Sequence, residues 1–315
     1  MIEQERVSTQ NAQLKEELES IGDDILHRFP IGDYLNDVTS HLGYGRLSHV
    51  IQKRKPKGIF PKMTSEYDLA VVSLYLKFAL SCAISNSLEL LKEKNLTGDI
   101  VRLYHEWFGN ILDEFSTQPD DYYHHRCYSY VMDVRVCTLT DIPVGGAWLV
   151  EITRVGLHPL ISGGPRQCID YLQFVTVKTG GFTPFCVVHT VPRYLCRFNK
   201  EEMDSSYLRI AELMKLYPGV RGVYRRSWFL DPKLEDISPD LVYLRQVPQH
   251  NGAKVFNAGT KKRDVKYALA MSPVRKRLYA QGKYQPTGYA YVCPRKEFLA
   301  WAERKRGSAS SYLVS

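Results

Sequence analysis

The sequence predicts an α+β fold in which a helical N-terminal portion precedes a mixed, largely antiparallel sheet. Apolar residues recur at helical spacing over residues 64–115 and at strand-like spacing from residue 130 onward. Residues 184–230 read as a strand, a helix and a returning strand. A unit of this length is a crossover, whose two strands pair in parallel. A chain of 315 residues, 44% of them hydrophobic, can bury a sizeable core.

The helical portion is expected to span residues 1–125. Residues 1–20 carry few large apolar side chains, which predicts a loosely attached helix. Apolar residues three and four apart predict two longer helices, over residues 64–94 and 98–115, joined as a hairpin. The apolar run at residues 69–84 contains a lysine and is shorter than the roughly 20 residues that a bilayer span requires. We therefore expect a buried helix there and no membrane span.

An α/β domain is expected over residues 126–306, and the small-residue segment 307–315 is expected to be a disordered tail. The first strands should form an antiparallel meander that leads into the crossover, with Gly180 and Gly181 turning a tight hairpin. The predicted strands are residues 130–136, 146–153, 168–178, 184–190, 219–230, 252–256 and 289–293, and the predicted helices are residues 201–217, 239–246, 264–270, 273–282 and 296–305.

The net charge of +8 is concentrated near the C-terminus. After residue 252 the chain has 14 lysines and arginines but 3 acidic residues. This asymmetry favours an anionic partner, which is nucleic acid, a phosphate-bearing cofactor such as coenzyme A, or an acidic carrier protein. The alternative is a solvated basic surface with no partner.

The seven cysteines include no C-x-x-C pair, and the N-terminus lacks the apolar core of a signal peptide. An odd, dispersed set of cysteines without an export signal predicts reduced thiols and a cytoplasmic location. Cys186 lies in an apolar run and is expected to be a small core residue.

The predicted order of antiparallel strands, crossover helix, parallel strand, helix and further strands resembles the core of the GNAT-type N-acyltransferases, over residues 130–295. The resemblance implies that the two parallel strands splay apart and that the pantetheine arm of an acyl donor lies in the opening, against the first strand. In this sequence the strand offers Phe185, Val187 and Thr190. The resemblance also implies that acyl-CoA or an acyl carrier protein is the donor, with no tightly bound cofactor.

In the family, a glycine-containing loop and the following helix N-terminus hold the pyrophosphate through backbone N–H groups. Residues 191–199 contain no glycine, and Glu201 and Glu202 place negative charge at the helix start. Arg193 and Arg197 offset that charge. N-acyl amino acid synthases and acyl-homoserine lactone synthases are similar in overall order and accept the acyl group from an acidic carrier protein, which the basic C-terminal segment would suit.

Acyl transfer to an amine needs a base for the amine proton, donors for the oxyanion and an acid for the leaving thiolate. The resemblance implies that Tyr243 is the acid. His189 ends the central strand, where ligands approach, and Glu151 lies in an otherwise apolar strand, so both are candidate bases. The alternatives are a tyrosine that covers the core, a satisfied core histidine, and a carboxylate that faces solvent or is held by Arg154.

Ser227, Trp228 and Asp231 emerge at the carboxyl end of the second parallel strand, where open α/β sheets place ligands. We therefore expect these residues to contact the substrate. The alternative is that Trp228 is a core residue and Asp231 a turn residue.

The sequence thus predicts an acyltransferase that moves an acyl group from acyl-CoA or acyl carrier protein to a small amine or amino acid. A second hypothesis is a non-haem iron or other metal enzyme, since Asp121, His124 and His125 have a spacing that suits one helical face. A third is a non-enzymatic nucleic-acid-binding protein, because the basic C-terminal segment is interleaved with tyrosines. No RNP, KH or zinc-knuckle signature accompanies that segment.

Overall fold

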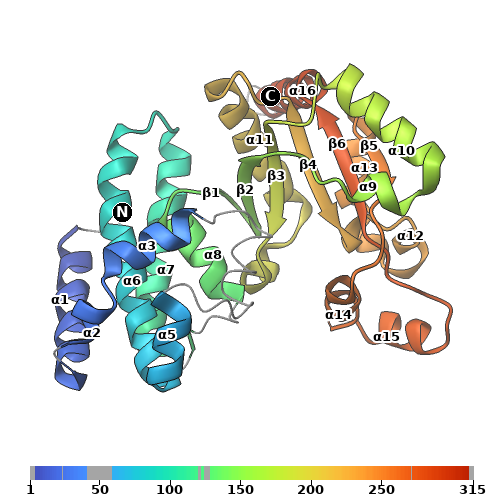
Figure 1. Ribbon diagram of the computed structural model, residues 1–315. Helices are drawn as coiled ribbons and strands as arrows, with labels where there is room; N and C mark the ends of the chain where they lie inside the picture. The colour runs from blue at the N-terminus through green and yellow to red at the C-terminus, as the bar shows by residue number, and fades with distance from the viewer. Residues whose placement is uncertain are drawn as a thin grey trace. The chain divides into compact units, whose positions relative to one another are not determined.

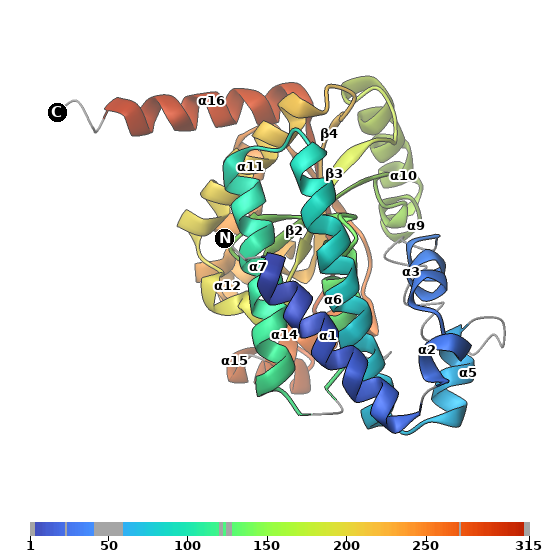
Figure 2. The same cartoon turned by 90° about the vertical axis from the view of Figure 1, so that its left-hand side faces the viewer.

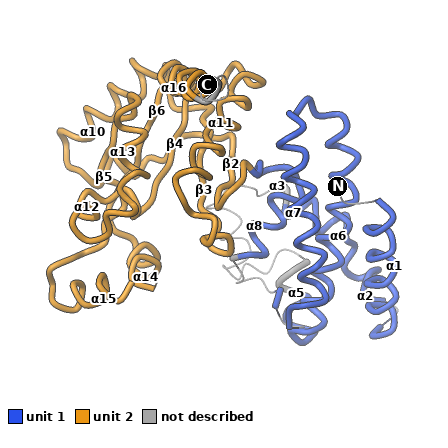
Figure 3. Tube along the Cα trace, turned by 180° about the vertical axis from the view of Figure 1, so that it is seen from behind, with its two compact units in different colours: residues 1–143 blue, residues 144–315 orange. Residues whose placement is uncertain are grey.

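The computed structural model describes residues 4–22, 24–40, 59–119, 122–123, 128–270 and 272–311. The chain forms two compact units, residues 1–143 and residues 144–315 (Figure 3). Unit 1 is helical, and unit 2 carries most of a mixed sheet. The predicted α+β class with a helical N-terminal portion is confirmed.

Unit 1 is built around helix α6 (Leu69–Glu93), whose start differs from the prediction. The Asp68 carboxylate accepts a hydrogen bond from Val71 N at 3.0 Å and so caps α6, while the preceding residues form a separate helix. The other helices of unit 1 are α1 (Gln4–Ile21), α2 (Ile25–Arg28), α3 (Ile31–Ser40), α5 (Ile59–Glu66), α7 (Gly98–Thr117) and α8 (Tyr128–Cys137).

Helix α1 lies along α6 (Figure 2) and buries Val7, Leu14 and Leu18. These residues share one face because they are seven and four positions apart. The expectation of a loosely attached first helix is therefore wrong, since three aliphatic residues on one stripe are enough to dock it.

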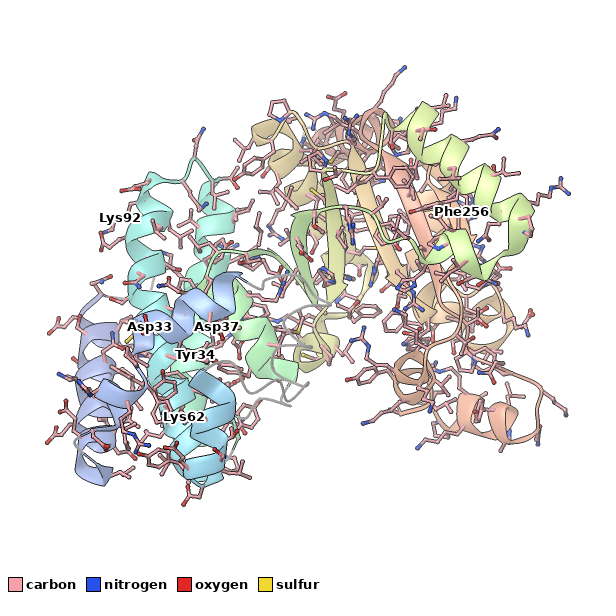
Figure 4. All side chains as sticks on the ribbon, in the orientation of Figure 1. Asp33, Tyr34, Asp37, Lys62, Lys92 and Phe256 are labelled. Carbon is pink, nitrogen blue, oxygen red and sulfur yellow. The ribbon has the colours of Figure 1, made fainter. Side chains whose placement is uncertain are left out.

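Helix α6 is long and apolar enough to cross a membrane by length and composition, but 67% of its apolar window is buried. Tyr34 of α3, which Figure 4 labels, packs edge-on against Tyr75 of α6, with ring centroids 5.5 Å apart. Most of the apolar surface of α6 is thus covered by protein, as predicted for a buried helix.

Helix α8 occupies the segment predicted as a strand at residues 130–136, so that prediction is wrong. Apolar and polar residues alternate over residues 132–136, as they do in a strand with one face exposed to water. Instead, Asp133, Arg135 and Asp141 are all fully buried. Trp107 Nε1 donates to Asp133 Oδ1 at 2.9 Å, and Arg135 donates two hydrogen bonds to the Asp141 carboxylate. Because Asp133 and Arg135 have buried hydrogen-bond partners, they do not need to face water.

Replacing Asp141 by alanine is expected to destabilise unit 1 by about 3–5 kcal/mol, because the buried Arg135 guanidinium loses its carboxylate. The measurement is urea unfolding followed by circular dichroism. Asp113, which pairs with Arg6 with both side chains about half exposed or more, is the matched control, and its alanine variant should lose no more than about 1 kcal/mol. Equal losses in the two variants would contradict the prediction.

The six-stranded sheet has the order β1-β2-β3-β4-β6-β5 (Figure 1). Strands β3 and β4 pair in parallel, and the pairs β2–β3, β4–β6 and β5–β6 are antiparallel, which confirms the predicted single crossover unit. The strands are β1 (Asp141–Gly145), β2 (Trp148–Thr153), β3 (Phe185–Thr190), β4 (Gly222–Ser227), β5 (Lys254–Asn257) and β6 (Tyr289–Pro294). Helix α11 (Lys200–Leu216) connects β3 to β4.

Helix α10 (Gly164–Gln173) and the π-helical turn Phe174–Lys178 replace the strand predicted at residues 168–178. Buried Tyr171 and Val175 are four positions apart, which is a helical period that the β-branched composition concealed. Because a helix precedes β3, Gly180 and Gly181 join that helix to the strand and do not form a hairpin. Both glycines have positive φ.

The remaining helices of unit 2 are α9 (His158–Ser162), α12 (Leu234–Ile237), α13 (Tyr243–His250), α14 (Lys262–Ala270), α15 (Pro273–Ala280) and α16 (Arg295–Ser311). Of these, α14, α15 and α16 lie near predicted positions, α13 begins four residues after the predicted start at Pro239, and the short helices α9 and α12 were not predicted. Helix α16 continues past the predicted helix end at Lys305 to Ser311, and residues 312–315 lie outside the described part of the chain.

The sheet in unit 2 has two covered faces, which follow from the alternation of side chains along each strand. On the α10 face, Phe185, Val187 and Tyr224 pack with Tyr171 of α10 and with Phe256, which Figure 4 labels. The α11 face carries the alternate residues, including Val188, Arg225 and Tyr291. The Tyr207 hydroxyl of α11 hydrogen-bonds the Tyr291 hydroxyl there at 2.6 Å.

Candidate active site

Strands β3 and β4 part near their carboxyl ends. Their pairing ends at Val188 and Arg225. Strand β3 nevertheless stays paired to β2 as far as Thr190, and β4 stays paired to β6 as far as Ser227. We call residues 189–190 and 226–227 the divergent ends, and in Figure 1 the two arrowheads point apart. The backbone groups that face this opening do not pair across it, so they can bind a ligand.

On the α10 face of the divergent ends, His189 and Glu151 form a pair. His189 Nε2 and Glu151 Oε2 are 3.2 Å apart, and the side chains are 17% and 9% exposed. The β2–β3 register places Glu151 opposite Val187, so its carboxylate lies diagonally beside the histidine. The structure therefore brings together the two residues that the sequence offered separately as bases.

Arg226 lies on the same face, across the opening from His189. Its Nη2 donates to Asp264 Oδ2 at 2.6 Å and to the Gly259 carbonyl at 2.9 Å. Nearby, Lys261 Nζ and His158 Nε2 are 2.8 Å apart. Burial lowers the pKa of both Lys261 and His158, and the Arg226 charge adds to each effect. This basic group was missed in the sequence, although two adjacent arginines inside an apolar strand are a signal.

On the α11 face, Arg225 is fully buried. Its Nη2 donates to Thr190 Oγ1 at 3.0 Å. Its guanidinium carbon lies 5.5 Å from the Trp148 ring centroid and 5.9 Å from that of Phe198. Nε and Nη1 have no hydrogen-bond partner among the described residues. Arg225, Trp148 and Phe198 were also missed in the sequence.

Tyr243, the predicted acid, begins helix α13. Its hydroxyl is buried and has no hydrogen-bond partner among the residues that the structure describes. Burial raises the pKa of this hydroxyl to about 12, and the nearby Arg225 charge opposes the increase. Tyr243 is thus protonated at neutral pH and shares an electrostatic environment with Arg225 and Tyr207.

The predicted donor-binding residues are dispersed. Phe185 and Val187 point into the core on the α10 face, and Thr190 stands at the divergent ends on the α11 face. Arg193 and Arg197 flank the ring of Tyr194 in the 3₁₀ turn Pro192–Arg197, with guanidinium carbons 5.8 and 5.9 Å from its centroid. In the following residues, the Asn199 side chain caps α11 by accepting from the Glu202 backbone N–H at 2.8 Å.

The predicted substrate residues have structural contacts. Ser227 Oγ accepts from Phe229 N at 3.2 Å. Trp228 is 6% exposed and lies under the Arg275 guanidinium, 4.9 Å from its ring centroid. Asp231 accepts backbone N–H groups with both carboxylate oxygens, and burial raises its pKa. These contacts fix the chain after β4.

Of the residues in the metal hypothesis, Asp121, His124 and His125 lie outside the described part of the chain. Among the described residues, no group of three or more His, Cys, Asp and Glu could hold a metal ion. Several basic side chains of the C-terminal segment have partners within unit 2: Lys254 with Asp170, Lys305 with Asp204, and Arg306 with Glu212.

No protein-family model matches the sequence, and no curated protein matches it. Among solved structures, the chain is similar to an acyltransferase in complex with CoA and 10C-teicoplanin, with a TM-score of 0.46, 11% identity and coverage of 91% of this chain and 99% of that one. It is also similar to an acyltransferase mutant in complex with octanoyl-CoA, with a TM-score of 0.48, 11% identity and coverage of 87% and 88%. Likenesses of this degree fix neither the reaction nor its substrates, which we infer from the site.

Proposed function

We propose that the protein is an acyltransferase that moves an acyl group from a thioester donor, acyl-CoA or acyl carrier protein, to a small amine or amino acid. The observation that carries the proposal is the parting of β3 and β4 after Val188 and Arg225, with a His189–Glu151 pair on one face and Tyr243 on the other. Base and acid thus lie on opposite faces of the sheet beside the divergent ends, which suits two substrates that enter from opposite faces.

The His189–Glu151 pair is suited to accept the amine proton. The Glu151 carboxylate, 3.2 Å from His189 Nε2, stabilises the imidazolium that forms when the histidine takes a proton. Tyr243 suits the opposite task, because its hydroxyl is protonated at neutral pH and can give its proton to the leaving thiolate. The amine therefore enters on the α10 face.

The thioester enters on the α11 face, where its pantetheine arm can lie against the end of β3 at Thr190, beyond the last residue that pairs with β4. Arg193 and Arg197 lie in the turn that follows and supply positive charge for phosphate groups. The basic surface of unit 2 is equally suited to an acidic carrier protein. The acyl donor is accordingly either acyl-CoA or acyl carrier protein.

The test is thermal melting of the full chain with acetyl-CoA, palmitoyl-CoA, free CoA and a palmitoylated acyl carrier protein, because a ligand that binds only the native state raises the melting temperature. We expect a rise with at least one acyl donor and transfer of its acyl group to an amine in a mixture of amino acids, detected by mass spectrometry. Absence of both with every donor would remove the proposal. A melting shift with a random oligonucleotide that disappears with salt would then favour the nucleic-acid hypothesis.

A further inference from the structure

Arg225 is a buried cation whose hydrogen-bonding capacity is mostly unused. It has no exposed surface and, within the part of the chain that the structure describes, reaches neutral hydroxyls alone: its Nη2 donates to Thr190 Oγ1, and its guanidinium also hydrogen-bonds the Tyr207 hydroxyl. Nε and Nη1 are buried without an acceptor among the described residues. A buried charged donor without an acceptor is costly, so the two unpartnered nitrogens at this point suit an acceptor that a ligand brings.

The surroundings of Arg225 also favour the binding of a ligand acceptor. Trp148 and Phe198 flank the guanidinium with their rings, which hold it in place but offer no hydrogen-bond acceptor in their planes. At such a buried point the charge interacts strongly with any negative charge that develops beside it. Phe198 is half-buried in the loop after β3, so it is the side chain that an entering ligand has to displace.

The position of Arg225 identifies the ligand atom. It is the last residue of β4 that pairs with β3, and on the same face it lies between Thr190 of β3 and Tyr243 of α13. The proposed donor places its thioester between that strand and that acid. The thioester carbonyl is therefore the acceptor that reaches Arg225.

We infer that Arg225 is a further catalytic residue, and that one of its unpartnered guanidinium nitrogens, Nε or Nη1, donates to the carbonyl oxygen of the acyl thioester and to the oxyanion formed from it. This inference rests on the proposed acyltransferase function. It assigns the oxyanion donor that the His189–Glu151 pair and Tyr243 leave missing.

In the reaction, the amine nitrogen forms a bond to the thioester carbon, and the carbonyl electron pair moves to the oxygen held by Arg225. The amine proton passes to the His189–Glu151 pair. When the carbonyl re-forms, the C–S bond breaks and the thiolate takes the Tyr243 proton. Arg225 keeps its positive charge throughout and acts as a hydrogen-bond donor.

The first experiment compares Arg225→Gln and Arg225→Lys with the wild type. We expect Arg225→Gln to lower kcat by about 10²–10³-fold, as loss of an oxyanion donor does, while free CoA still raises the melting temperature. Arg225→Lys should recover part of the loss because it keeps the charge. A kcat of Arg225→Gln close to that of the wild type would overturn the inference.

Arg275→Gln is the matched control, because Arg275 is also a buried arginine against a tryptophan ring. Its guanidinium, however, bonds protein oxygens, the Ala268 carbonyl and Ser238 Oγ. We expect its kcat, per mole of folded protein, to match that of the wild type. An equal loss in both arginine variants would mean that Arg225 is structural, and would overturn the inference.

A second measurement uses the wild type and does not depend on a variant that folds. Thioether analogues lack the carbonyl, so S-ethyl-CoA and S-hexadecyl-CoA should raise the melting temperature less than acetyl-CoA and palmitoyl-CoA respectively. Equal shifts would overturn the role of Arg225 while leaving the acyltransferase proposal intact. No shift with any thioester and no turnover would remove the proposed function, and the inference with it.

Discussion

The His189→Gln variant is expected to lose about 10²–10⁴-fold in kcat, the usual effect of removing a general base. The acyl donor should still raise the melting temperature of this variant, because His189 projects from the α10 face and the donor lies on the α11 face. Steady-state kinetics with the identified amine give the first quantity, and thermal melting gives the second. Added imidazole should restore part of the rate.

The pair makes a sharper prediction than either residue alone. Because Glu151 acts through His189, the double variant His189→Gln/Glu151→Gln should be about as slow as His189→Gln, so the two losses are not additive. The matched controls are His250→Gln and Glu303→Gln, whose side chains are exposed. Retention of wild-type kcat in His189→Gln, or additive losses in the double variant, would exclude the pair as the base.

The crossover unit could be predicted because its evidence is local. The change from a continuous apolar run to helical spacing and back is visible in one stretch of sequence, and the structure has β3, α11 and β4 there. The segments that form α8 and α10 were wrongly predicted as strands. For α8 the decisive evidence is not local. Asp133 and Arg135 are buried against partners elsewhere in unit 1, so their polarity did not mark a solvent face.

The site was only partly predictable, because its geometry depends on strand register. His189 and Glu151 were each identified from their positions in apolar strands, but their contact depends on the pairing of β2 with β3. Arg225 and Arg226 are neighbours in sequence and therefore project to opposite faces of the sheet. Arg226 bonds Asp264, and Arg225 keeps two guanidinium nitrogens without a partner among the described residues. Only the fold distinguishes these roles.

Replacing Tyr243 by phenylalanine should lower kcat by about 10²-fold or more with thioesters of alkyl thiols, since the expelled thiolate then has no acid. With a thioester of thiophenol, whose thiolate is a much weaker base, the variant and the wild type should react at similar rates. Tyr279→Phe, at a 40% exposed position on α15, is the control. An equal loss with both leaving groups would show that Tyr243 is not the acid.

The pH dependence gives an independent check on the same residue. Burial moves the pKa of Tyr243 from 10.0 to about 12, and the acid works only while protonated. The wild-type kcat should therefore not decline between pH 8 and pH 10.5 through loss of this proton, whereas an unperturbed tyrosine would be mostly ionised at the upper limit. The free energy of unfolding should follow the same direction. The contribution of the neutral hydroxyl to stability is fully present below pH 10.0 and is lost as the pH rises through about 12. Circular dichroism over the same range confirms that the fold is retained. A fall in kcat centred near pH 10 in the wild type, and absent from Tyr243→Phe, would mean that the hydroxyl is exposed to solvent and not held in the apolar surroundings of Arg225 and Tyr207.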